Sequence, residues 1–166
     1  AIVAQWINGM LNIQQNIEAQ ADAAPLNYAD LPESFLTFED AASYLNRPVA
    51  MIQNDEITLS TIHTDKAENG FIMLESTYVM PNGSNIMSWQ YFYDSSLQSV
   101  GSSTPANEQP QAYALSNGIT IYLGTGLEGD AYGQANWEQG QLFISGSRLE
   151  LATLRNLIED LIFVSG

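Results

Sequence analysis

The residues best placed to bind a ligand form a row of aromatic side chains. Trp89, Tyr91 and Tyr93 alternate with Gln90 and Phe92 in an apolar stretch. Because successive side chains of a strand point to opposite faces, the three aromatic residues are predicted to share one face. Such a row could stack on a sugar ring or line a lipid-sized groove. The alternative is packing across neighbouring strands, which is the commoner use of aromatic rows in sheets.

Carboxylates are the second set of candidate residues. Glu75 lies in the middle of an apolar stretch and Glu138 follows Trp137 directly, and both contexts favour partial burial. A glycosidase needs two carboxyl groups roughly 5 to 10 Å apart in a cleft, so a carboxylate-pair hydrolase is one alternative. The simpler interpretation of Glu75 is the outward face of an alternating strand.

Transition-metal and triad chemistry find little support in the composition. His63 is the single histidine and there is no cysteine, so the several nitrogen or sulfur ligands of a zinc site are missing. No G-x-S-x-G motif marks a serine nucleophile. Calcium remains possible, although no EF-hand spacing is present. Its candidate ligands are acidic pairs that we interpret as solvated loop residues: Asp55 with Glu56, Asp65 with Glu68, and Glu128 with Asp130.

A glycine-rich segment at residues 124–129 matches G-x-G-x-x-G. In a dinucleotide site this motif opens a helix whose N-terminus faces the pyrophosphate. Here the segment leads into another predicted strand, and Glu128 and Asp130 would repel phosphate. We therefore predict a hairpin or loop, and we predict no cofactor, no metal and no catalytic residue.

Charge and length narrow the classes of partner. The 166 residues carry 19 Asp and Glu against 4 Lys and Arg, for a net charge of −15. Such a chain lacks the clustered cations that bind nucleic acid or an anionic membrane surface. No apolar run reaches the roughly 18 residues of a transmembrane helix. The length is that of one domain, spanning residues 1–166.

Helical patterns occur at both ends of the chain. Over residues 1–24, apolar residues recur at spacings of three or four and predict an amphipathic helix, with an irregular connection up to residue 33. Thr37 and Asp40 resemble a capping box for a short helix that ends before Pro48. Ser147 and Glu150 predict the start of a C-terminal helix. Its apolar stripe comprises Leu151, Leu154, Leu157, Ile158, Leu161 and Ile162.

Strand patterns fill the middle of the chain. Alternating apolar stretches are separated by Asn-Gly and similar turn signals, which favour consecutive hairpins. The predicted strands cover residues 57–62, 71–80, 86–93, 113–115, 119–123, 131–137 and 142–145, with a long polar loop at 95–111. The predicted fold is α+β: a curved antiparallel sheet of about seven or eight strands, packed by the C-terminal helix and flanked by the N-terminal one.

One family resemblance covers about residues 37–163. Residues 137–146 (WEQGQLFISG), together with the leucine-rich stretch after them, are similar to the ending of a bacterial family of unknown function, and residues 37–42 (TFEDAA) are similar to its opening helix. Members of that family are extracytoplasmic Gram-positive lipoproteins or membrane-anchored proteins, some of them anti-sigma-factor-like or sporulation-related. The resemblance implies an extracytoplasmic location, either secreted or membrane-anchored through a segment upstream of Ala1, and it implies no catalytic residues.

The predicted function follows from these observations together. We expect a non-catalytic module of the cell envelope that binds a small molecule or a protein partner through Trp89, Tyr91 and Tyr93. Nucleic acid and direct membrane insertion by this segment are not expected. The alternatives are a secreted carbohydrate-active hydrolase with a carboxylate pair, and an assembly domain that pairs through the N-terminal helix.

Overall fold

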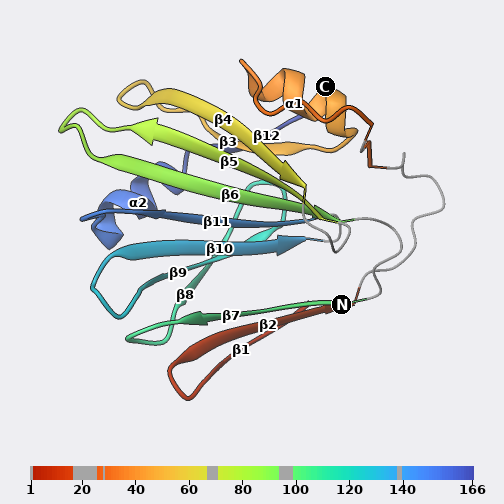
Figure 1. Ribbon diagram of the computed structural model, residues 1–166. Helices are drawn as coiled ribbons and strands as arrows, with labels where there is room; N and C mark the ends of the chain where they lie inside the picture. Colours follow the sequence, from red (N-terminus) through yellow and green to blue (C-terminus); the bar gives the residue numbers. More distant parts are fainter. Residues whose placement is uncertain (1, 17–25, 28, 67–70, 94–98, 138–139) are drawn as a thin grey trace.

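The computed structural model describes the chain except for residues 1, 17–25, 28, 67–70, 94–98 and 138–139 (Figure 1). The described part is mostly β, with two short helices. In chain order the elements are β1 Ile2–Ile7, β2 Met10–Asn16, α1 Phe38–Leu45, β3 Val49–Ile52, β4 Thr58–Lys66, β5 Phe71–Val79, β6 Asn85–Tyr93, β7 Ser99–Pro105, β8 Gln111–Ala114, β9 Thr120–Thr125, β10 Ala131–Trp137, β11 Gly140–Gly146, α2 Leu151–Ile158 and β12 Leu161–Val164.

A seven-stranded antiparallel sheet forms the centre of the molecule, in the order β4-β5-β6-β11-β10-β9-β8. Its long strands alternate buried and partly exposed residues along their length. The buried side chains of one face point into the main core, and we call this the inner face. The prediction of an antiparallel sheet built from consecutive hairpins is confirmed, whereas its curvature stays a prediction.

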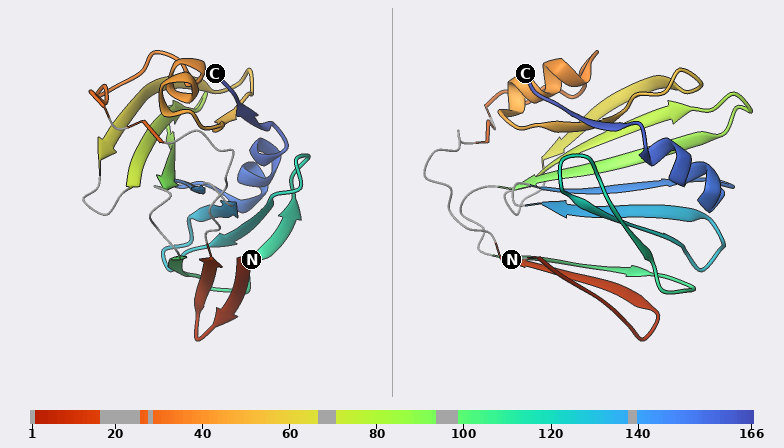
Figure 2. Two further views of the ribbon diagram at one scale, coloured as in Figure 1. Left: turned by 90° about the vertical axis from the view of Figure 1, so that its right-hand side faces the viewer. Right: turned by 180° about the vertical axis from the view of Figure 1, so that it is seen from behind.

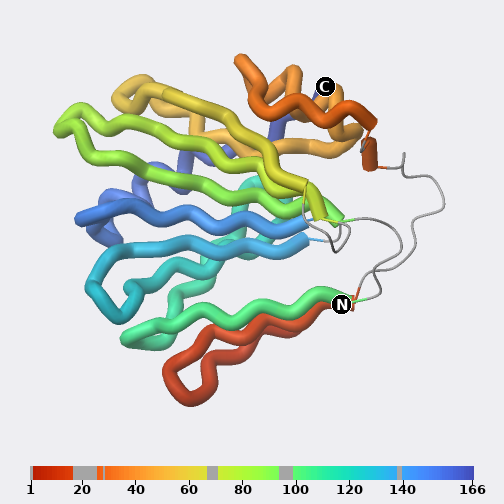
Figure 3. Tube along the Cα trace, viewed as in Figure 1, coloured from red at the N-terminus to blue at the C-terminus, as the bar shows by residue number. Residues whose placement is uncertain are grey.

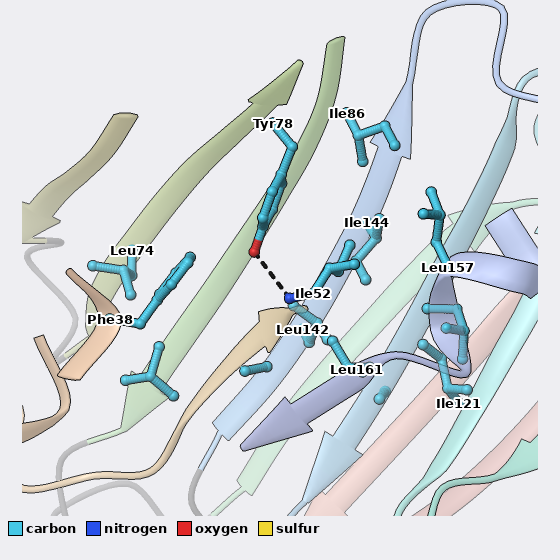
Figure 4. Packing of buried hydrophobic residues seen from close by; sticks show 14 of the residues in the cluster. Phe38, Ile52, Leu74, Tyr78, Ile86, Ile121, Leu142, Ile144, Leu157 and Leu161 are labelled. Carbon is cyan, nitrogen blue, oxygen red and sulfur yellow. Dashed lines mark hydrogen bonds between the residues drawn. The ribbon is translucent and has the colours of Figure 1, made fainter. Parts of the chain in front are cut away.

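The inner face is covered by α1, α2 and a two-stranded sheet of β3 and β12 (Figure 2). Side chains from both layers form one core, which includes Phe38, Leu74, Ile121, Leu142 and Leu157 (Figure 4). Helix α1 matches its prediction closely. Thr37 is its N-cap, and the hydroxyl oxygen accepts a hydrogen bond of 3.1 Å from the Asp40 amide.

Two polar side chains of the inner face complete the edge of β3. The Ala50 amide donates to Gln90 Oε1 and the Ala50 carbonyl accepts from Gln90 Nε2, both at 2.7 Å. The Ile52 amide donates to the Tyr78 hydroxyl at 3.2 Å. Because β3 pairs with β12 on its other side, these side chains take the place of a neighbouring strand. The N–H and C=O of Ala50 and the N–H of Ile52 are thereby satisfied.

The predicted N-terminal helix is wrong. Residues 2–16 form the hairpin β1–β2, which joins β7 in a three-stranded sheet (Figure 3), and residues 17–24 lie outside the described part. The hairpin turns at Asn8 and Gly9, whose φ angles are 54° and 74°. Two successive residues with positive φ make a type I′ turn and cannot continue a right-handed helix.

Three further predictions are corrected, one in the loop at 95–111 and two in the C-terminal helix. Residues 99–105 of the predicted loop form strand β7, which pairs with β2. The C-terminal helix ends at Ile158, and residues 161–164 form β12 against β3. Glu150, not Ser147, is the helix N-cap, and its side chain makes no capping hydrogen bond. Leu154, Leu157, Ile158 and Leu161 of the predicted stripe are buried, the last of them from a strand, whereas Ile162 is 38% exposed.

Candidate ligand-binding groove

The outer face of the seven-stranded sheet carries an aromatic cluster. Trp89 on β6 stands opposite Phe143 on β11 and opposite Glu75 on β5 in the strand register. Tyr91, two residues along β6, therefore lies on the same face. Its ring meets Phe143 edge to face at a centroid distance of 6.1 Å. The alternation that buries Gln90 and Phe92 in the core thus places Trp89 and Tyr91 on the outside.

The three-stranded sheet covers another part of this outer face. Leu11 and Ile13 of β2 are buried against Tyr132 of β10. Beside them, Gln134 of β10 is fully buried, and its side-chain oxygen accepts a 2.7 Å hydrogen bond from Thr104 of β7. Gln134 also donates to Ser102 of β7. These contacts hold β7 above β10, next to the aromatic cluster.

A groove with a volume of about 560 Å³ lies between β7 and the aromatic cluster. That volume is within the range typical of small-molecule sites, which are also mainly apolar. We call it the outer groove. Its lining comprises Trp89, Tyr91, Thr104, Pro105, Gly126, Leu127, Glu128, Asp130, Tyr132, Phe143, Ile144 and Ser145.

A hydrogen bond fixes the indole ring at this groove. Trp89 Nε1 donates to Glu75 Oε2 at 3.0 Å, so the carboxylate orients the ring. Burial raises the pKa of the nearby Tyr91 hydroxyl above its usual value, and the Glu75 charge adds to the increase. The aromatic surface is held in position before any ligand arrives.

Tyr93 does not line the outer groove, although it shares a face with Trp89 and Tyr91. Its side chain is only 3% exposed and meets Phe71 edge to face, with 5.4 Å between ring centroids. Its hydroxyl is buried without a hydrogen-bond partner among the described residues. Tyr93 thus packs against a neighbouring strand, which was the alternative prediction for all three aromatic residues of this strand.

The rim of the outer groove is acidic. The segment at 124–129 connects β9 to β10 through a tight turn, in which Gly129 has a φ of 88°, and it opens no helix. This turn places Leu127, which is 72% exposed, beside Glu128 and Asp130. No lysine or arginine is among the groove's lining residues. The electrostatics therefore favour a neutral or cationic ligand over an anionic one.

The other candidate residues lie elsewhere. His63 is exposed on β4, where it is opposite Glu75 in the register, and Glu138 lies outside the described residues. Glu75 contacts the indole of Trp89 but is not part of the groove lining. Within the described ranges, no three acidic or histidine side chains gather as a metal site would require. None of the helices in those ranges is long and apolar enough to cross a membrane.

Most of the groove's lining residues were not predicted as a site. Tyr132 and Phe143 come from β10 and β11, and Leu127 comes from the turn that resembled a nucleotide motif. Alternation places Phe143 on the face opposite to Leu142 and Ile144, but all three residues are apolar, so the sequence does not indicate which face is outward. Its position beside Trp89 depends on strand order, which local patterns do not encode.

Comparisons of the chain with protein-family models, curated proteins and solved structures find no match.

Proposed function

We propose that the protein is a non-catalytic binding module whose ligand occupies the outer groove. The observation that carries this proposal is the aromatic floor of Trp89, Tyr91 and Phe143 beside an acidic rim. Exposed aromatic surface of this kind stacks on sugars, apolar side chains and cations. No observation favours the carboxylate-pair hydrolase over a binding role, since Glu75 is bonded to Trp89 and lies outside the groove lining.

The extracytoplasmic location belongs to the same proposal and rests on the family resemblance of residues 37–163. The reading frame upstream of Ala1 tests it directly. A lipoprotein signal or one membrane-spanning helix is the expected finding, and a start codon immediately before Ala1 would contradict the proposal.

Replacing Trp89 by alanine is expected to weaken ligand binding roughly 30-fold, the loss typical of a central aromatic contact. The measurement is the shift in unfolding temperature with neutral oligosaccharides, short peptides and neutral lipids, followed by calorimetry for any that bind. Trp6→Ala removes an indole from β1, away from the groove, and is the matched control. Binding that survives Trp89→Ala unchanged, or no binding by any of the three classes, would refute the proposal.

A second candidate function, assembly of two copies, is favoured by the N-terminal hairpin. Strand β1 is at the edge of the three-stranded sheet, and Val3 and Ile7 are 53% and 49% exposed. Residues 1–16 contain no charged side chain, although the chain carries a net charge of −15. Exposed edge strands are usually protected by charges, and β1 lacks them. We propose that two copies pair through this edge, where like-charge repulsion is smallest.

Ile7→Lys is expected to weaken this self-association at least about tenfold, because it places a charge on an exposed edge strand that otherwise carries none. Light scattering over a range of protein concentrations measures the change. Gln14→Lys adds the same charge to the inner strand β2 and is expected to leave the dimer intact. A wild-type protein that stays monomeric at all concentrations would rule out the assembly role.

A further inference from the structure

Strand β7 has a free edge beside the outer groove. It is the last strand in the order β1-β2-β7, and among the described residues it pairs only with β2. Thr104 and Pro105 of β7 line the groove together with Trp89 and Phe143. A free strand edge therefore borders the aromatic floor.

The hydrogen-bond pattern identifies the backbone groups at this edge. The Ala106 amide donates to the Gly9 carbonyl at 2.9 Å, which makes these two residues a hydrogen-bonded pair. Hydrogen-bonded and non-hydrogen-bonded pairs alternate along an antiparallel ladder. Gly101 and Ser103 therefore direct their N–H and C=O groups away from β2. Pro105 follows the same alternation, so its backbone nitrogen also faces away from β2. The N–H that proline lacks is therefore not one that the β2–β7 ladder needs.

Strand β7 is held firmly enough to receive another strand. Ser102 and Thr104, which alternate with the free-edge residues, are both bonded to the buried amide of Gln134. Val100 on the same side is buried. The free edge is thus positioned by the side chains that anchor β7 to β10.

We propose that the outer groove takes an extended peptide segment of a protein partner, which adds to β7 as a fourth strand. This inference rests on the proposed function of the groove and specifies its ligand. A strand added to β7 lies about 4.8 Å further on, and facing sheets pack about 10 Å apart. Because β7 sits above β10, the next position lies over β11 and β6, where Phe143 and Trp89 form the floor.

The side chains of such a segment follow from the groove's chemistry. Alternate residues of the added strand point toward the floor and must be apolar to cover Trp89 and Phe143. The residues near the rim meet Glu128 and Asp130, and a basic side chain complements them. The net charge of −15 favours the approach of a basic segment over an acidic one. The partner segment is therefore expected to be apolar at alternate positions and to carry a basic residue near the rim.

A synthetic peptide of about eight residues that alternates leucine with lysine tests this proposal. Calorimetry with the full chain is expected to show binding. Two altered peptides serve as comparisons: one with glutamate in place of lysine, and one with methylated backbone nitrogens on the side that faces β7. Both are expected to bind at least about tenfold more weakly, because one loses charge complementarity and the other loses its main-chain hydrogen bonds.

Ser103→Pro and Ser103→Ala form a matched pair of variants. Both remove the Ser103 hydroxyl, which donates to Asn12 Oδ1, but only proline removes the N–H at the free edge. Ser103→Pro is expected to weaken peptide binding about tenfold relative to Ser103→Ala. The unfolding temperature shows whether each variant is folded, and the methylated peptide tests the same bonds on the wild-type protein.

The outcomes separate this inference from the proposed function. Equal binding by Ser103→Pro and Ser103→Ala, or equal binding of plain and methylated peptides, overturns strand addition. Trp89-dependent binding of an oligosaccharide or lipid, with no peptide binding, also overturns it but leaves the groove as the binding site. If each ligand that binds the wild-type protein binds Trp89→Ala equally well, the outer groove is not the binding site.

Discussion

Replacing Gln90 by leucine is expected to lower the free energy of unfolding by about 4 kcal/mol. Gln90 is fully buried on β6, and both of its amide atoms are bonded to the backbone of Ala50. Leucine fills a similar volume, so the core stays packed. It leaves the Ala50 N–H and C=O without partners, and each unpaired buried group costs about 1–3 kcal/mol.

The effect should appear at the layer that covers the inner face. Strand β3 has one neighbouring strand, β12, and depends on Gln90 and Tyr78 along its other edge. Chemical denaturation measures the change in stability. Hydrogen exchange is expected to show that the Ala50 amide loses protection by more than other core amides do.

Gln141→Leu is the matched control for Gln90→Leu. Gln141 on β11 is also buried, but its side-chain nitrogen has no hydrogen-bond partner among the described residues. Leucine at 141 removes this unpaired amide nitrogen, and we expect a change within about 1 kcal/mol. If Gln90→Leu and Gln141→Leu cost the same, the bonds to Ala50 do not secure β3.

The sequence predicts the parts of this fold that local rules govern. Helix α1 follows from its cap at Thr37 and from its four apolar residues, all of which are buried. The strands of the central sheet follow from alternation and turn residues. The aromatic face of β6 follows from the same alternation, so Trp89 and Tyr91 could be named in advance. Tyr93 obeyed the pattern equally well, and only its packing against Phe71 removes it from the groove.

The N-terminal hairpin illustrates how two periodicities can coexist in one segment. The apolar residues from Ile2 to Ile13 fit a helical stripe, but alternate residues of the same segment also face the sheet as strands. Asn8-Gly9 decides between them, because the two central residues of a type I′ turn need positive φ, which Asn-Gly adopts readily. Asn-Gly turn signals also predicted the hairpins in the middle of the chain. At the N-terminus this turn signal was a better guide than the helical spacing of the apolar residues.

Strands β7 and β12 could not be predicted from local patterns. Strand β7 is rich in serine and forms because β2 supplies a ladder and Gln134 supplies side-chain bonds. The residues of β12 continue the apolar stripe of α2, and their strand conformation depends on pairing with β3. Both strands owe their structure to partners distant in sequence. The outer groove shares this origin, since β7 forms one of its walls.

The stability of the protein is expected to fall as the pH rises from about 10 to about 12. Burial raises the pKa of Tyr78 to about 12, although the hydrogen bond from the Ile52 amide lowers it in part. Burial also raises the pKa of Tyr93 and of Tyr132 above the usual value. A raised pKa in the folded state means that unfolding releases a proton above pH 10. The contribution of these tyrosines to the free energy of unfolding is thus fully present below about pH 10, and it is lost as the pH rises through their pKa values in the folded state.

The expected loss from Tyr78 alone is about 2.7 kcal/mol, which corresponds to a pKa difference of about two units.

Two phenylalanine variants separate this effect from simple loss of packing. Tyr78→Phe leaves the Ile52 amide unpaired, so it should lower stability near pH 7 while making the alkaline decline shallower. Tyr93→Phe removes a buried hydroxyl that has no partner among the described residues, so it should raise stability near pH 7 and also make the decline shallower. Urea denaturation at pH values from about 7 to 12 measures both effects. A wild-type free energy of unfolding that stays constant across this range, or variants that decline as steeply as the wild type, would show that these tyrosines do not resist ionisation as their burial requires.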